Sequence, residues 1–219
     1  MIAQTGNFSV QIEADYLLRR SRCAKTGLHL LMAAMSSMFF LFLISYILRS
    51  QVSDWEALSE PWQPLASTWQ LWINTAFLVL ASVALELAKR SLRRLDKALT
   101  RDLMLVAGAA SVAFLVGQLV FWNALGNMGY FASSNAANAF FYLLTGLHGV
   151  HLLGGLVAWV RAIYRLNHDN SEQASAKAGL GVELCATYWH FLLFVWLGLF
   201  ALLSSSPATY AAIAKLCGF

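Results

Sequence analysis

The chain has 219 residues, of which 59% are hydrophobic and only 12% are charged, and its formal net charge is +4. Soluble domains carry roughly 25% charged residues, so this composition argues against an ordinary soluble enzyme and indicates an integral membrane protein. The three cysteines, Cys23, Cys185 and Cys217, stand far apart and form no CxxC pair. Neither a disulfide framework nor a zinc site is therefore predicted.

Five apolar runs are long enough to cross the hydrocarbon core of a bilayer, which takes roughly 20 helical residues. Because backbone polar groups in lipid must be paired within the protein, each run is predicted to be a helix. The predicted fold class is all-α, an integral membrane bundle of five transmembrane helices within residues 28–203. In chain order, the predicted helices cover residues 28–48, 69–88, 103–122, 139–160 and 181–203.

The segments outside these helices are short. Residues 1–27 form a polar tail without the apolar core and cleavage site of a signal peptide, and residues 204–219 form a second tail. Thirteen of the 15 Lys and Arg residues fall in the first tail and in the connections 89–101 and 161–180. The positive-inside rule then places the N-terminus in the cytoplasm and the C-terminus outside, on the periplasmic side. Because topology explains the basic residues, no nucleic-acid partner is predicted.

Polar side chains recur inside the fourth and fifth predicted helices, where a bilayer makes them costly and usually functional. Residues three, four or seven apart share one face of a helix. Two such sets occur, namely Thr145, His148 and His151 in the fourth helix and Glu183, Thr187 and His190 in the fifth. The two helices are antiparallel neighbours in the sequence, so the histidines are predicted to meet near mid-membrane.

Three interpretations of these residues remain open. A buried hydrogen-bond cluster suits imidazoles, because each can donate from one nitrogen and accept at the other. A metal or haem site is the second, since histidine is a common ligand, but no ExxH di-iron motif occurs. A proton or quinol site is the third, and it needs a chain of ionisable groups. Only Glu86 and Glu183 lie within helices, and Glu86 is followed by Lys89 and Arg90, which predicts an interfacial ion pair. The number of available partners favours the structural cluster.

Two longer motifs carry a resemblance to a known family. TGLHGVHLLGG at 145–155 resembles the penultimate helix of subunit III of haem-copper oxidases. YWHFLLFVWLGLF at 188–200, which contains Tyr188 and Trp189 and follows Glu183, resembles the last helix of that subunit. Together these two elements are the most specific part of the resemblance.

Two further helices extend the resemblance to the range from about residue 70 to 203. NTAFLVLAS at 74–82 resembles the family's helix with an Asn-Thr pair and a serine, and the matching asparagine is Asn74. FLVGQLVFW at 114–122 resembles a helix with a matching glutamine at Gln118. Taken alone, these two elements would be weak signals.

The resemblance implies the five-helix form of subunit III, which binds neither haem nor copper and has no catalytic or metal-ligating residue of its own. Redox chemistry in this family resides in subunits I and II, so the implied partners are subunit I, subunit II and a small subunit IV. Structural phospholipid is implied as well, since seven-helix members hold lipids in a cleft. The implied setting is a bacterial or archaeal inner membrane. There the chain would support an enzyme that reduces oxygen to water and moves protons. The implied internal polar network comprises Thr145, His148, His151, Glu183, Thr187 and His190.

The sequence also departs from the family pattern at three acidic positions. Met35 stands where many relatives carry a buried glutamate, and Phe121 and Leu193 replace acids in the third and fifth predicted helices. These losses weaken a role in proton uptake and leave two other functions open. One is the subunit III-like protein of a nitric oxide reductase system. The other, from a different class, is a stand-alone transporter or quinol-binding protein. The sequence does not distinguish cytochrome c from quinol as the electron donor.

Overall fold

The computed structural model describes residues 2–50, 69–134, 136–168 and 172–205, together with residues 209, 212 and 215. Five helices in this part of the chain are long and apolar enough to cross a membrane. They are α1 (Ile2–Arg49), α2 (Trp69–Arg93), α3 (Lys97–Asn127), α4 (Ala136–His168) and α5 (Glu172–Leu203). The predicted all-α bundle of five transmembrane helices is confirmed, and each predicted range lies inside an observed helix.

The helices are longer than the predicted spans, and α1 shows the largest difference. It begins at Ile2, so the predicted polar tail 1–27 is part of this helix. Hydropathy marks only the part of a helix that lies in hydrocarbon, whereas the i to i−4 hydrogen bonds continue into the polar region. Most of the other predicted tail, 204–219, lies outside the described residues, and so does Cys217.

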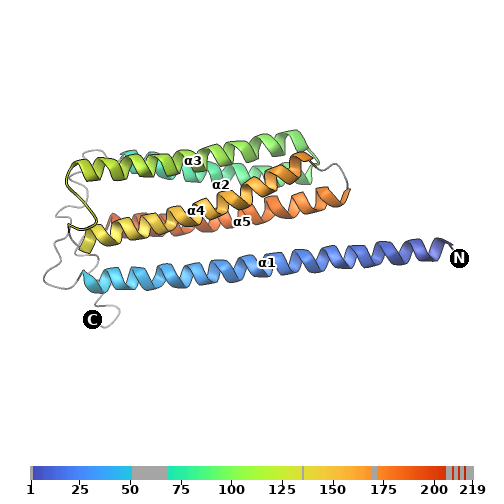
Figure 1. Ribbon diagram of the computed structural model, residues 1–219, viewed down its shortest axis with the longest axis horizontal. Helices are drawn as coiled ribbons and strands as arrows, with labels where there is room; N and C mark the ends of the chain where they lie inside the picture. Colours follow the sequence, from blue (N-terminus) through green and yellow to red (C-terminus); the bar gives the residue numbers. More distant parts are fainter. Residues whose placement is uncertain are drawn as a thin grey trace.

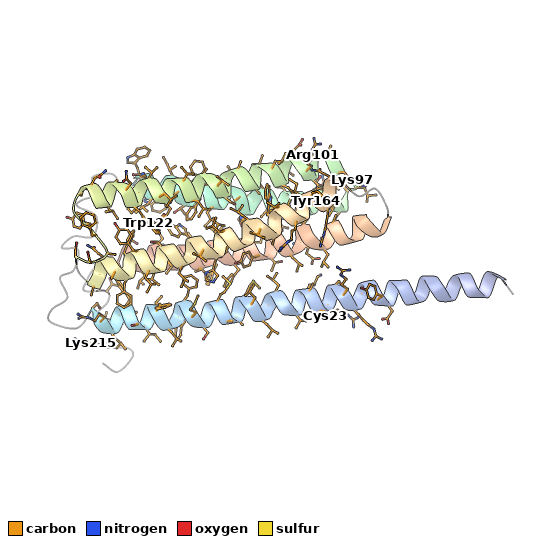
Figure 2. All side chains as sticks on the ribbon, viewed as in Figure 1. Cys23, Lys97, Arg101, Trp122, Tyr164 and Lys215 are labelled. Carbon is orange, nitrogen blue, oxygen red and sulfur yellow. The ribbon has the colours of Figure 1, made fainter. Side chains whose placement is uncertain are left out.

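The helices run up and down along one common direction, and the start of α1 and the end of α5 lie at opposite ends of the bundle (Figure 1). The N-terminal end of α1 lies at the same end as the α2–α3 and α4–α5 connections. Lys97 and Arg101 lie at this end as well, and Trp122 lies toward the other (Figure 2). An odd number of antiparallel spans therefore places the basic connections at one end, as the charge pattern predicts.

Short turns with defined caps join α2, α3 and α4. The Asp96 carboxylate accepts a hydrogen bond of 3.0 Å from the backbone N–H of Leu99, which caps the start of α3. Beyond the end of α3, Gly129 has a φ of +88°, which glycine adopts without a Cβ penalty. The Tyr142 hydroxyl donates to the carbonyl of Tyr130 at 2.8 Å and ties this turn to α4.

Three tryptophans connect the helices of the α2–α5 bundle through their indole N–H groups. Trp159 of α4 donates to the Met104 carbonyl of α3 at 2.9 Å. The other two belong to α5 and are buried. Trp189 donates to Ser111 Oγ of α3 at 2.8 Å, and Trp196 donates to Thr75 Oγ1 of α2 at 3.0 Å. Each bond satisfies a donor that would be costly to leave unpaired in the core.

Glycines allow close approach where these helices cross. A Cβ added at Gly108 would lie 2.3 Å from the Trp159 ring, and one at Gly117 would lie 2.1 Å from Asn74 Oδ1. These positions therefore require glycine for packing, because small residues let transmembrane helices approach closely. The α2–α5 helices form a tightly packed four-helix core.

Helix α1 lies alongside α4 and α5 and extends past the bundle at its N-terminal end (Figure 1). Lys25 Nζ forms an ion pair of 2.8 Å with Glu183 of α5. Farther along the helix, the Tyr188 hydroxyl lies 3.8 Å from Met35 Sδ, and the ring centroids of Phe39 and His151 are 5.6 Å apart. Side-chain contacts along its length thus attach α1 to α4 and α5.

Candidate functional site

His148 lies in the centre of the four-helix core and has no solvent exposure. Its ring centroid is 5.2 Å from that of Trp196 and 5.8 Å from that of Phe114. Neither imidazole nitrogen has a hydrogen-bond partner within the described residues. Its contacts are therefore aromatic packing between α3, α4 and α5, and not the interhelical hydrogen bonds that the sequence suggested.

His151 points to a different environment although it is only three residues away. Its Nδ1 donates to the Leu147 carbonyl at 2.8 Å, within α4. The ring is half-buried against Phe39 of α1. The pair therefore divides, with His148 in the core and His151 between α4 and α1.

His190 lies on the outer side of the bundle, where its side chain is 46% exposed. Its Nδ1 is hydrogen-bonded to Ser82 Oγ of α2, and its Nε2 is 3.6 Å from Glu86 Oε2. The prediction that His190 meets His148 near mid-membrane is wrong. The face of α5 that carries His190 turns toward α2, and the core face of α5 carries Trp189 and Trp196 instead.

The remaining polar positions make mostly local bonds. Thr145 Oγ1 donates to the Phe141 carbonyl at 2.7 Å, and Thr187 Oγ1 donates to the Glu183 carbonyl at 3.0 Å. Such bonds to the i−4 carbonyl satisfy a hydroxyl inside one helix. The Glu183 carboxylate is the exception, since it pairs with Lys25 of α1. The six residues of the predicted network therefore occupy several separate places. The predicted ion pair of Glu86 is confirmed, with Lys89 at 3.1 Å and Arg90 at 3.3 Å.

The family-motif positions lie in or beside the core. Asn74 and Gln118 are both buried, and the amide nitrogen of each lacks a hydrogen-bond partner within the described residues. Asn74 packs against Gly117 of α3. The buried Trp189 joins α5 to α3, and the Tyr188 hydroxyl donates to the His151 carbonyl at 3.0 Å. Tyr188 and Trp189 thus join α5 to α4 and α3, whereas Asn74 and Gln118 are packed inside the core.

The three positions that depart from the family pattern are filled by apolar packing. Met35 is buried beside Tyr188. Phe121 is fully buried, with its ring centroid 6.0 Å from that of Phe141. Leu193 is half-buried and packs against the core. Apolar contacts therefore occupy the sites where an acid was expected from the resemblance.

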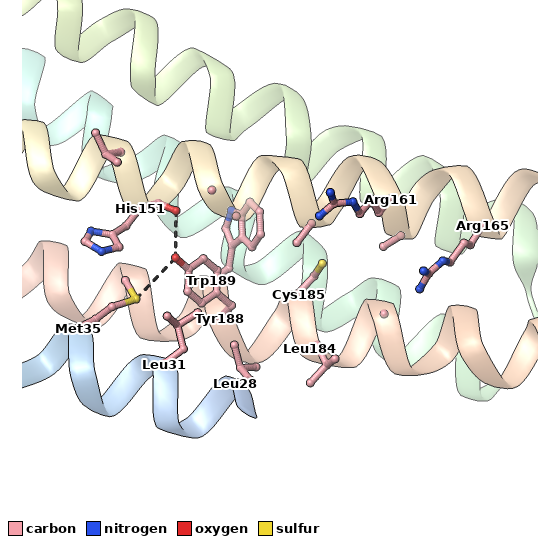
Figure 3. Close-up of a pocket in the computed structure, with 16 residues that line it drawn as sticks. Leu28, Leu31, Met35, His151, Arg161, Arg165, Leu184, Cys185, Tyr188 and Trp189 are labelled. Atoms are coloured by element: carbon pink, nitrogen blue, oxygen red, sulfur yellow. Dashed lines mark hydrogen bonds between the residues drawn. The ribbon is translucent and has the colours of Figure 1, made fainter. Parts of the chain in front are cut away.

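A groove of about 500 Å³ lies between α1 and the α4–α5 pair, and we call it the α1 groove. Its walls are mainly apolar, and Arg161 and Arg165 of α4 stand at one end (Figure 3). The bonds from Tyr188 to the His151 carbonyl and to Met35 cross its other end. Within the described residues, neither arginine has an ion-pair partner. The groove thus combines an apolar channel with two free cations, a combination that suits an acyl chain and an anionic headgroup.

Sequence reasoning used Arg161 and Arg165 only as topology signals and missed their place in this groove. A signal was present, because Gly154, Ala158, Arg161 and Arg165 follow one another at spacings of four, three and four residues. That spacing places them on one face of α4. What the sequence did not supply was the helix that this face meets, which is α1.

The described residues contain no cluster of three His, Cys, Asp or Glu side chains that could hold a metal ion. His190 and Glu86 form a pair of such groups, with 3.6 Å between Nε2 and Oε2. The assignment of haem and copper to partner subunits stays a prediction.

Comparison with known proteins gives a consistent result. The sequence matches the family described as cytochrome c oxidase subunit III over residues 8–205. It is 40% identical over 88 residues to a probable cytochrome c oxidase subunit 3 of Nocardia farcinica, which covers 40% of this chain and 42% of that protein. For cytochrome c oxidase subunit 3 of Corynebacterium diphtheriae, the identity is 37% over 87 residues, covering 40% of this chain and 41% of the relative. The identity to cytochrome c oxidase subunit 3 of Synechocystis sp. is 31% over 121 residues, which covers 55% of this chain and 50% of that relative. The matched segments thus span half or less of these relatives.

Proposed function

Because the chain belongs to the cytochrome c oxidase subunit III family, we propose that it serves as the non-catalytic subunit III of a respiratory haem-copper oxidase. The observation that carries this proposal is the family match over residues 8–205, which includes parts of all five helices. The assembled enzyme would reduce oxygen to water and move protons. The oxidase names of the bacterial relatives favour this assembly over a nitric oxide reductase system and over a stand-alone transporter.

The proposed partners are the catalytic subunit I, subunit II and a small subunit IV, with haem and copper held in those subunits. The proposed location is the bacterial inner membrane, with the N-terminus in the cytoplasm. The excess of Lys and Arg at the end that carries Lys97 and Arg101 supports this orientation. The role of this chain is then to stabilise the catalytic subunit and to organise lipid beside it.

The α1 groove supports the lipid part of this role. A phospholipid would lay an acyl chain along the apolar wall formed by Leu28, Leu31 and Leu184 and place its phosphate beside Arg161 and Arg165. The acyl chain would fill the groove and contact its apolar wall. A guanidinium can bind phosphate through two N–H groups at once. The lipid would thereby fill the space that α1 leaves open.

The function is tested by purifying the tagged full chain from its native membrane in mild detergent. The expected result is co-purification of a large subunit with haem bands in the reduced-minus-oxidised spectrum, identified by its mass. A chain that purifies without a haem protein would overturn the proposal.

The lipid is tested on the same purified complex by measuring bound phospholipid per complex. Replacing Arg161 and Arg165 with glutamine should weaken headgroup binding by about 30-fold, since each basic residue near a membrane surface contributes about 1 kcal/mol. Ala158→Phe should displace the acyl chain by filling the groove while leaving both arginines in place. The control is Val157→Phe, because Val157 belongs to the same helix and is 53% exposed but does not line the groove. Unchanged lipid content in both groove variants would refute a lipid in this groove.

A further inference from the structure

Helices α2 and α5 carry polar side chains on the outer surface where they meet. We call this surface the α2/α5 seam and define it by Val79, Val83 and Glu86 of α2 and His190 and Phe194 of α5. Val79, Val83 and Phe194 are 40%, 50% and 77% exposed, and the side chains of Glu86 and His190 are 28% and 46% exposed. The seam therefore combines an exposed aromatic ring with two ionisable groups.

The depth of this surface makes its polarity costly. His190 lies midway along the apolar segment Ala178–Leu203 of α5. Its contacts with Ser82 and Glu86 place it about 10 to 17 Å from the Arg93 end of α2, at 1.5 Å per residue. Ionisable groups inside the apolar region are rare against lipid and almost always face protein or a water-filled cavity. An imidazole on the outer side of the bundle at this depth therefore suits a surface that a protein partner covers.

The outer surfaces of α3 and α4 in the apolar region are, by contrast, free of polar side chains among the described residues. The exposed residues of α3 between 105 and 120 are leucine, valine and alanine. On α4, the exposed positions from 143 to 158 include Leu143, Val150, Leu153 and Val157 and no polar side chain. These surfaces suit acyl chains, and the contrast distinguishes the seam from them.

The bonds within the seam specify the chemistry of the partner. The charge of Glu86 is balanced by Lys89 and Arg90, and His190 Nδ1 is bonded to Ser82. Its Nε2, at 3.6 Å from Glu86, has no hydrogen bond of ordinary length. In the apolar region, the seam is therefore complementary to a partner that presents a neutral hydrogen-bonding group rather than an opposite charge. Phe194, one turn away on the same face, offers an aromatic anchor, a residue type enriched in interface centres.

The seam widens at its basic end into a hollow of about 270 Å³ lined by Lys89, Leu92, Arg93, Gly179 and Glu183. The Glu183 carboxylate in this hollow is already paired, because it binds Lys25 of α1. Arg93 has no ion-pair partner in the described part of the chain. A partner that fills this hollow is therefore complementary when it presents an acidic side chain there.

We propose that the α2/α5 seam is the surface that docks against a transmembrane helix of the haem-bearing catalytic subunit. That helix would bring a neutral hydrogen-bonding side chain to His190 and an acidic side chain to Arg93. The assignment rests on the proposed function, since it takes the catalytic subunit as the partner. It goes beyond that function by selecting one surface of this chain and the residues that meet the partner.

The test introduces a photo-reactive benzoylphenylalanine at single positions of the full chain in its native membrane. Val83 and Phe194 probe the seam, and Val157 of α4 and Val112 of α3 are matched controls, with 53% and 49% exposure. All four side chains face outward, so the substitutions leave the core packing intact. The expected result is a cross-link to the haem-bearing subunit from both seam positions and from neither control.

A second measurement uses His190→Leu and His190→Gln in the affinity-purified complex. His190→Leu should lower the amount of catalytic subunit that co-purifies by about fivefold, the effect of losing one interhelical hydrogen bond. His190→Gln should retain it, because the amide can donate and accept at a similar reach.

The outcomes separate this inference from the proposed function. If the haem-bearing subunit co-purifies but cross-links only from Val157 or Val112, the seam is not the docking surface and the proposed function stands. If the seam positions form only lipid adducts, or link to a protein without haem, the inference is overturned. If no haem-bearing subunit co-purifies with the unmodified chain, the proposed function itself has failed.

Discussion

Helices α1 and α2 both cross the proposed membrane, yet they are held in different ways. In the most apolar stretch of α2, 50% of the residues are buried inside the protein, whereas the figure for α1 is 22%. Helix α2 packs against Gly117 of α3 and accepts the hydrogen bond of Trp196. Helix α1 is attached through side chains and borders the α1 groove. The comparison indicates that α2 belongs to the tightly packed core and that α1 is the least buried of the five helices.

The largest loss of stability is expected from a substitution at the α3–α4 crossing. Gly108→Ala places a Cβ 2.3 Å from the Trp159 ring, so the two helices must separate or the indole must move. Overpacking of this kind should lower the free energy of unfolding by about 3 kcal/mol. The measurement is denaturant unfolding of the purified complex in detergent.

The matched control for that variant is Gly198→Ala. The added Cβ at this α5 position has no heavy atom within 4 Å. Its stability should be unchanged or slightly higher, since alanine has the better helix propensity. Equal losses in the two variants would mean that the close α3–α4 crossing does not carry stability.

A smaller effect is expected when a core hydrogen bond is removed. Thr75→Val leaves the buried N–H of Trp196 without its acceptor, and an unsatisfied buried donor should cost about 2 kcal/mol. Thr187→Val makes the same chemical change at a hydroxyl that bonds only to the carbonyl of Glu183 in its own helix. The fluorescence-detected thermal transition of both variants measures the difference. A similar shift for the two would contradict a special role of the α2–α5 bond.

The smallest effect is expected for the ion pair that holds α1. Lys25→Gln removes the partner of Glu183, but both side chains are about 40% exposed, at 42% and 39%, so the loss should be below about 1 kcal/mol. The bundle should keep its unfolding transition while α1 becomes easier to displace. Faster labelling of Cys185, which lines the α1 groove, reports this change.

Arg19→Gln is the control for the α1 ion pair. Arg19 pairs with Asp15 within α1, at exposed fractions of 78% and 60%. Its loss should leave the labelling rate of Cys185 unchanged. An unfolding transition that shifts as far for Lys25→Gln as for Gly108→Ala would show that α1 belongs to the stable core after all.

The number and type of the helices could be predicted from the sequence because hydropathy and length report directly on burial in lipid. Hydropathy also predicted the start of α2 at Trp69 and the end of α5 at Leu203. It did not give the start of α1, because the residues before 28 are polar and a helix outside hydrocarbon leaves no hydropathy signal. The placement of the basic connections at one end also followed from the sequence.

The candidate site could be predicted only in part. Periodicity predicts Glu183, Thr187 and His190 on one face of α5, but a period does not say which helix each residue meets. Glu183 pairs with Lys25 of α1, whereas His190 is hydrogen-bonded to Ser82 of α2 and lies 3.6 Å from Glu86. The aromatic residues of α5 determine where His190 lies, because their rings occupy the core and leave His190 on the outer side.

The ion pair between Lys25 and Glu183 joins residues that are 158 positions apart in the chain. Within the described residues, the helices that α1 contacts are α4 and α5, which are synthesised after α2 and α3. The α2–α3 pair can associate as soon as it has been made, whereas α1 can reach its contacts only after α4 and α5 have been made. We therefore expect α1 to dock after the α2–α3 pair has formed.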